Sequence, residues 1–191
     1  TALHIDYEVL RNSGNLNLTT GTFTDIAGGL WSTGMSTLDT VTLSQAGTGL
    51  RSASGTLSAT GIGFIDTTVA IASQQGASTT VQSITGTNVA LLIDAADSDD
   101  LTVSNGVVTG HRLLLANGAS AFSMSDIEFE GNPSESLPVV DQRCMGSCSW
   151  DGIDVNNVTN GFFLSGSGNH SISGLNLTAA ERGIEGTGTG H

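Results

Sequence analysis

The densest group of ionisable side chains in this 191-residue sequence is the acidic segment 94–100. Its four carboxylates are Asp94, Asp97, Asp99 and Asp100. Carboxylate oxygens are the ligands that Ca²⁺ prefers, so a metal site is one interpretation of the segment. The segment lacks the ordered alternation and the glycine of a calcium-binding loop. A solvated turn is therefore the favoured interpretation, and calcium is the alternative.

A catalytic alternative combines Asp99 and Asp100 with His111. Paired carboxyl groups can act as acid and base on a glycosidic bond, provided that the fold brings them to one groove. The sequence contains no serine-hydrolase elbow, phosphate-binding glycine loop or dinucleotide fingerprint. These observations favour a protein that is not an enzyme.

The only two cysteines, Cys144 and Cys148, are four positions apart. One disulfide that closes a small loop is the preferred interpretation, with free thiols as the alternative. A zinc site would need a second pair of ligands at suitable spacing, which the sequence does not provide.

The chain carries a formal net charge of -13, with five Lys and Arg residues in total, all of them Arg. Nucleic-acid binding depends on basic residues that neutralise phosphates, so this charge disfavours a nucleic-acid partner. Anionic polysaccharides and anionic membranes are disfavoured for the same reason. No apolar run approaches the roughly 20 residues of a membrane span.

The elements that would position these residues follow a repeat of about 21 residues, a period typical of solenoids. Three apolar or glycine positions recur in each copy, spaced by two residues and then by one. The middle position falls at Gly21, Val41, Ile62, Ile84, Gly106, Ile127, Val158 and Leu175. A short strand-and-turn unit repeated in this way predicts a solenoid.

Two further columns support the repeat. A second apolar column follows nine residues later, at Leu30, Leu50, Ile71, Ile93, Leu115 and Ile184. The residue before each middle position is small or polar: Thr20, Thr40, Gly61, Ser83, Asn105, Asp126, Asn157 and Gly174. Because Gly, Asn and Asp tolerate left-handed backbone conformations, this column predicts a sharp bend in every coil.

The spacing, the bend residues and segments such as SDDLTVSNGVVTG and NHSISGLNLT resemble right-handed parallel β-helix proteins with PbH1-type repeats. That group includes pectate lyases, polygalacturonases, phage tailspikes and many cell-surface proteins. The resemblance spans about residues 14–185. It implies an all-β, single-stranded right-handed parallel β-helix (a solenoid) of about eight coils, with roughly 21 residues per coil.

The resemblance also bears on the catalytic alternative. Polygalacturonase-like enzymes place three aspartates on adjacent coils, near a Gly-His-Gly element and a downstream Arg-Lys pair. This chain has Asp99 and Asp100, and Gly110-His111-Arg112, which is a fragment of that arrangement. It has neither an Asn-Thr-Asp element nor any lysine. One scaffold hosts many activities, so the resemblance implies a fold and not a function.

The spacing between the middle positions Ile127 and Val158 is longer than one repeat. It predicts a loop insertion at about 131–150 within a single solenoid domain, 1–191. Loops on a rigid solenoid concentrate specific contacts. No amphipathic capping helix is visible at either end. We therefore expect either a longer chain with adjacent coils or open ends that meet another copy.

Two surface features suggest further roles. The residue after the middle position is often threonine, in the column Thr22, Thr42, Gly63, Thr85, Val107, Glu128, Thr159 and Asn176. A flat threonine face resembles that of ice-binding solenoids, although threonine is favoured on β surfaces in general. Acceptor sequences for N-glycosylation occur at Asn17, Asn157, Asn169 and Asn176, which favours a surface location.

Together these features predict an extracellular or cell-surface β-solenoid with a structural or adhesive role, able to assemble end to end into a filament or surface layer. A carbohydrate-active β-helix enzyme, either a polysaccharide lyase or a hydrolase, is the first alternative, and an ice-binding protein is the second. The expected partners are other copies of the chain and polysaccharide. No cofactor is expected, calcium being the exception already named.

Overall fold

The computed structural model describes residues 10–74, 76–98 and 100–188. The described part is built of strands and contains no helix. The strands are β1 (Leu10–Asn12), β2 (Asn15–Leu18), β3 (Gly21–Ile26), β4 (Leu30–Ser32), β5 (Met35–Ala46), β6 (Thr48–Ser52), β7 (Gly55–Gln74), β8 (Ala77–Ala96), β9 (Asp100–Glu130), β10 (Val140–Gly166), β11 (Asn169–Ser173) and β12 (Asn176–Gly188). Accordingly, no helix long and apolar enough to cross a membrane occurs in these residues.

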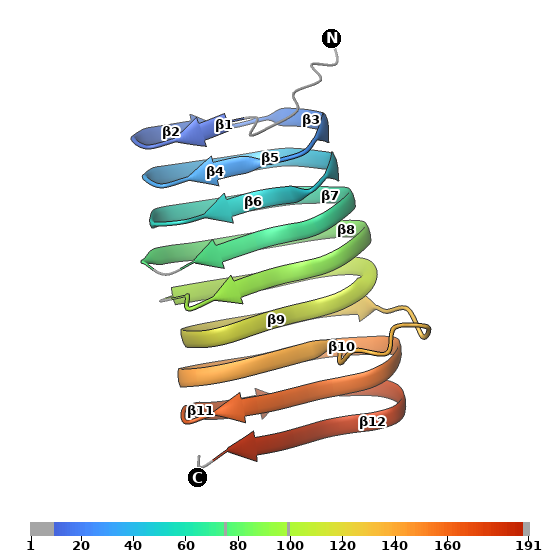
Figure 1. Cartoon of the computed structure of the whole chain (residues 1–191). Coiled ribbons are helices and arrows are strands. Elements are labelled where there is room, and N and C mark those ends of the chain that lie inside the picture. The colour runs from blue at the N-terminus through green and yellow to red at the C-terminus, as the bar shows by residue number, and fades with distance from the viewer. Residues whose placement is uncertain (1–9, 75, 99, 189–191) are drawn as a thin grey trace.

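All strands pair in parallel with their equivalents one coil away, and together they form a β-solenoid of about eight turns (Figure 1). The register is regular: Val41 pairs with Ile62, and Ile62 with Ile84. The front strands in Figure 1 run from right to left while the chain descends, so the solenoid is right-handed. The predicted fold class is confirmed.

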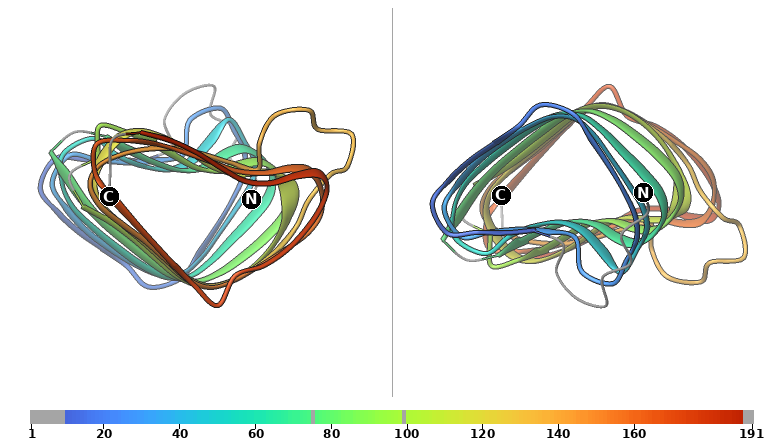
Figure 2. Two further views of the ribbon diagram at one scale, coloured as in Figure 1. Left: turned by 90° about the horizontal axis from the view of Figure 1, so that it is seen from below. Right: turned by 90° about the horizontal axis from the view of Figure 1, so that it is seen from above.

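Seen along its axis, the solenoid is triangular (Figure 2). We call its sides face 1, face 2 and face 3 in chain order. Face 1 contains 35–39 and the residues in register with them, face 2 contains 41–44 and theirs, and face 3 contains 46–52 and theirs. Strands β7 to β10 are long because they continue around the corners.

Residues with positive φ mark the corners. The first corner, between faces 1 and 2, has this backbone at Thr40, Gly61, Ser83, Asn105, Asp126, Gly152 and Gly174. The second corner, between faces 2 and 3, has it at Asp25, Gln45, Asp66, Asn88 and Asn157. Gly, Asn and Asp are the residues that adopt this region at least cost. The predicted bend column is thus confirmed from Thr40 to Asp126 and at Gly174, whereas Thr20 does not have a positive φ.

The predicted alignment of the coil around Val158 is wrong, whereas Leu175, next to Asn176, keeps its predicted place in the last coil. Ile127 pairs with Ile153 and not with Val158, and Asp154 in turn pairs with Asn176. Asn157 therefore lies at the second corner, and Gly152 takes its predicted place at the first. The sequence around Val158 imitates the repeat because both corners accept the same residue types.

The insertion is also shorter than predicted. The irregular segment covers 131–139, and Val140 already pairs with Leu114 in the coil before. Residues 140–150 belong to β10 and continue the coil. A third correction concerns Leu115, because Ile93 pairs with Leu114 and Leu115 points outward beside Asp94. A slip of one residue exchanges the inner and outer sides of a strand.

The interior is a continuous column of buried aliphatic and aromatic side chains. Its largest member, Trp150, lies between Phe122 and Phe162, with ring centroids 4.9 and 5.1 Å away. The predicted disulfide between Cys144 and Cys148 is confirmed, with both residues fully buried. It closes a bulge where the register of β10 against β9 shifts.

Candidate functional site

The structure places the acidic segment on three different parts of the coil. Asp94 lies on face 3, Asp97 has a φ of 51° at the corner between faces 3 and 1, and Asp100 begins face 1. Asp100 accepts a hydrogen bond of 3.3 Å from Ser78 Oγ. Asp99 lies outside the described residues. Within the described part of the chain, no three His, Cys, Asp or Glu residues gather as a metal site.

Partial burial raises the pKa of Asp94, and the positive charge of Arg51 partly opposes this. Arg51 also stacks on the ring of Trp31, as Arg11 does from the opposite coil, at 4.5 and 4.7 Å from the ring centroid. These contacts follow the strand register, in which Arg11, Trp31 and Arg51 are in line. They stabilise the outer surface of face 3 in the first coils.

His111 is two corners away from Asp100, on face 3. Its Nδ1 lies 3.9 Å from Oε2 of Glu135, which belongs to the inserted loop. The structure therefore does not bring the described members of the predicted catalytic set together. Instead, His111 contacts the loop 131–139 through Glu135.

The neighbouring residue, Arg112, holds the same loop from the preceding coil. Its Nε donates a hydrogen bond of 3.0 Å to the carbonyl oxygen of Pro138. Its guanidinium also lies 3.9 Å from a carboxylate oxygen of Asp141. The end of the loop is thus tied to face 3 at the point where β10 begins.

The following coil holds the loop from its other side. Asn160 Nδ2 donates to the carbonyl oxygen of Ser136 at 2.8 Å, and the hydroxyl of Thr159 donates to the carbonyl oxygen of Pro133. The backbone carbonyl oxygen of Asn160 also accepts a hydrogen bond of 3.0 Å from the backbone N–H of Val139. Because contacts come from both neighbouring coils, the loop has a defined position on the solenoid.

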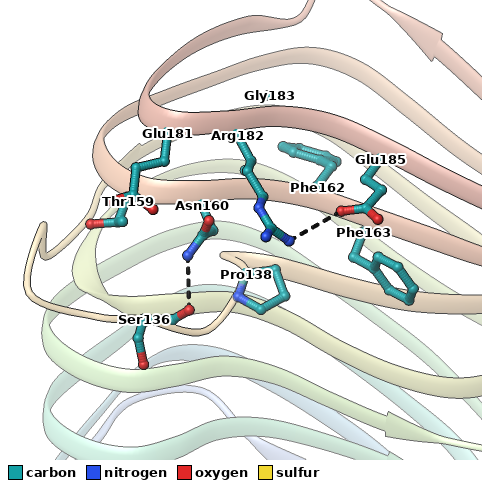
Figure 3. Close-up of a pocket in the computed structure, with 11 residues that line it drawn as sticks. Ser136, Pro138, Thr159, Asn160, Phe162, Phe163, Glu181, Arg182, Gly183 and Glu185 are labelled. Atoms are coloured by element: carbon teal, nitrogen blue, oxygen red, sulfur yellow. Dashed lines mark hydrogen bonds and ion pairs between the residues drawn. The ribbon is translucent and has the colours of Figure 1, made fainter.

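A cleft of about 410 Å³ lies between this loop and the last described coil (Figure 3). Ser136 and Pro138 form the loop side, and β12 forms the opposite side through 181–185. Residues 159–163 of β10 lie between them, including the half-buried Phe163. The volume is within the range of small-molecule sites in proteins.

The charged groups of the cleft all come from β12. Arg182 Nη1 lies 3.4 Å from Oε2 of Glu185, and both side chains are largely exposed. Glu181 adds a second carboxylate, so the cleft carries one cationic and two anionic groups. Glu185 is in register with Phe163, which places an aromatic ring beside this ion pair.

A second, shallower groove lies over the first corner and face 2. It has a volume of about 540 Å³ and includes Asp126, Glu128 and Asp154. The predicted threonine column runs along this face from Thr22, but Asp154 occupies the place predicted for Thr159. The charged residues Glu128 and Asp154 therefore interrupt the column before it ends at Asn176.

Face 1 carries a more continuous series of hydroxyl groups. The second outward position of this face is Thr37, Ser58, Thr80 and Thr102 in four coils in register. The same position is Ser123, Ser149 and Ser171 in the last three coils. All seven side chains are at least partly exposed, and they contain no charge.

The four predicted glycosylation sites are exposed: Asn17, Asn157, Asn169 and Asn176. Two of them make hydrogen bonds from their amide groups. Asn157 donates to the carbonyl oxygen of Gly131 at 3.5 Å, and Asn176 donates to Asp154 at 3.2 Å. Their modification remains a prediction.

Sequence reasoning did not identify the cleft. Phe163 lies in an apolar run, and Arg182 lies outside any recognisable motif. One signal is present: in the alternation of β10, Phe162 is inward and Phe163 is outward, which places an aromatic ring on the outer surface. Comparison with family models, curated proteins and solved structures finds no match to the chain.

Proposed function

We propose that this chain is a structural and adhesive β-solenoid of the extracellular space or the cell surface, which contacts its partner through the loop 131–139 and the adjoining cleft. The position of the loop carries this proposal. It departs from an otherwise regular coil, yet it is anchored from the coils on both sides by Arg112 and Asn160. Preorganised loops on rigid scaffolds bind at a low cost in conformational entropy.

The scaffold role is supported by the uniform core and ladder. Every coil buries aliphatic side chains against the next, so the solenoid gains stability coil by coil. The parallel pairing has a constant register, so the backbone groups of an edge strand can also pair in parallel with a strand of a second copy. Mass photometry and small-angle scattering at rising concentration test end-to-end assembly, and a strictly monomeric particle at high concentration contradicts it.

Adhesion is tested with a variant that lacks 133–137. The deletion makes the step from Ile127 to Ile153 equal in length to the step from Gly106 to Ile127, so the shortened coil matches the coil before it. Purified protein is applied to beads of cellulose, chitin, agarose, hydroxylated silica and gelatin-coated polystyrene. We expect retention of the parent chain on at least one surface, and loss of that retention in the deletion variant but not in the face 1 control Ser58→Ala. Equal retention of both chains, or no retention of the parent, contradicts adhesion through the loop.

Ice binding is a second candidate, which the hydroxyl series on face 1 favours. The residues of this series repeat at the strand spacing of about 4.8 Å along face 1. The expected result is thermal hysteresis that the double substitution Thr80→Tyr and Thr102→Tyr removes. Thr85→Tyr on face 2 is the control, because it adds the same bulk outside the series. An absence of hysteresis in the parent chain contradicts this candidate.

A further inference from the structure

We propose that the cleft between the loop 131–139 and β12 binds a neutral saccharide. The inference rests on the proposed function, because it names the chemical class of the partner at the same cleft. The inference goes beyond the proposed function by assigning separate roles to the aromatic, polar and charged groups that line the cleft.

The apolar part of the cleft suits the C–H face of a sugar ring. Phe163 is half buried, so part of its ring remains free to contact a ligand. The Pro138 ring lines the same cleft from the loop, and Figure 3 shows both rings. The hydrogen bond from Arg112 to the carbonyl oxygen of Pro138 fixes the backbone of Pro138. Aromatic rings offer apolar area with few rotatable bonds, which lowers the entropy cost of binding.

The polar part supplies planar groups that pair with adjacent hydroxyl groups. Arg182 presents several N–H donors in a fork, and Glu181 and Glu185 present carboxylate acceptors. The contact between Arg182 and Glu185 restrains both side chains beside Phe163. Hydrogen bonds to charged groups are stronger than those between neutral ones, so these residues can orient a polyol.

The charge of the cleft selects among saccharides. Two carboxylates and one guanidinium leave an excess negative charge, and the chain as a whole has a net charge of -13. This field repels uronate and sulfated sugars, and no second cation lines the described cleft to offset it. A neutral sugar avoids this repulsion and still uses both the donors and the acceptors.

The experiment is isothermal titration of the purified chain with neutral gluco-, galacto- and manno-oligosaccharides, with oligogalacturonate as the anionic comparison. We expect at least one neutral series to bind and the uronate not to bind. Phe163→Ala is expected to weaken binding about tenfold. Phe163→Leu, which keeps apolar volume but removes the ring, gives an intermediate loss. Glu185→Gln also weakens binding, whereas Glu128→Gln in the shallow groove is the matched control and leaves it unchanged.

Circular dichroism and unfolding curves show whether each variant is folded. If Phe163→Ala does not fold, the exposed substitutions Arg182→Gln and Glu185→Gln carry the test. The proposal is overturned if no neutral series binds, if the uronate binds more tightly, or if the folded cleft variants bind as the parent does. Loop-dependent retention on silica or gelatin without any saccharide binding would overturn the ligand class and leave the adhesive function standing.

Discussion

The indole Nε1 of Trp150 donates a hydrogen bond of 2.9 Å to Oε1 of Gln142, and both side chains are buried inside the solenoid. The two residues lie on either side of the disulfide between Cys144 and Cys148. They therefore connect face 3 to face 1 across the corner that follows the inserted loop. The coil that carries the loop is thus closed on its inner side by a polar contact as well as by a covalent bond.

Trp150→Phe removes the donor and leaves the Gln142 carbonyl oxygen buried without its partner. We expect the free energy of unfolding to fall by at least about 2 kcal/mol, from the unpaired acceptor and the lost packing between Phe122 and Phe162. Urea unfolding followed by circular dichroism measures the change. Trp31→Phe on the outer surface of face 3 is the control and should cost much less.

Replacing both cysteines by alanine should lower stability by about 2 kcal/mol, because the disulfide closes a short loop and constrains the unfolded chain. The parent chain under reducing conditions should show a comparable loss. Urea unfolding with and without a reductant makes the comparison. If the reductant lowered the midpoint of the alanine variant as much as that of the parent chain, the disulfide would not be the cause.

Asp94→Asn should stabilise the protein near neutral pH. Partial burial raises the pKa of Asp94 above its ordinary value of 3.8, so the folded state bears an unfavourable charge once this carboxyl ionises. Stability from this group is therefore full at low pH and falls as the pH rises through the folded-state pKa. We expect a gain of less than about 1 kcal/mol at pH 7, since solvent screens a half-exposed group. The gain should vanish below about pH 3, where Asp94 is largely protonated in both states. A constant gain across this range, measured by unfolding at each pH, would contradict the explanation.

The bend column offers a matched pair of substitutions. Thr40 has a φ of 54° and Asn105 has a φ of 55° at the equivalent corner of another coil. Because a β-branched residue is strained in this region and asparagine is not, Thr40→Asn should stabilise by about 1 kcal/mol and Asn105→Thr should destabilise by a similar amount. Thermal unfolding provides the measurement. Changes of the same sign in both variants would show that backbone strain does not decide the effect.

The sequence was sufficient to predict the solenoid, because inward aliphatics such as Val41, Ile62 and Ile84 recur at nearly constant spacing. It was not sufficient for the register of the coil that contains Gly152 and Asn157. Asn157 and Gly152 both suit a left-handed bend, and the repeat alone does not tell one corner of a triangular coil from another. Only the pairing of Ile127 with Ile153 separates them.

The cleft was beyond prediction for a different reason. Pro138, Phe163 and Arg182 are distant in sequence and belong to a loop and two coils. Their proximity depends on how Arg112 and Asn160 fix the loop, and these are backbone-directed contacts with no sequence signature. The same contacts explain why His111, predicted as a catalytic alternative, faces Glu135.

The coil from Ile62 to Ile84 and the coil from Ile84 to Gly106 contain the same number of residues, so the solenoid is built of equivalent coils. Duplicating the segment 62–83 would insert one complete coil with its corners in place. Each such insertion would move the cleft away from the first coil by about 4.8 Å, without a change in the contacts around it. The length of the molecule and its recognition site can therefore be altered independently.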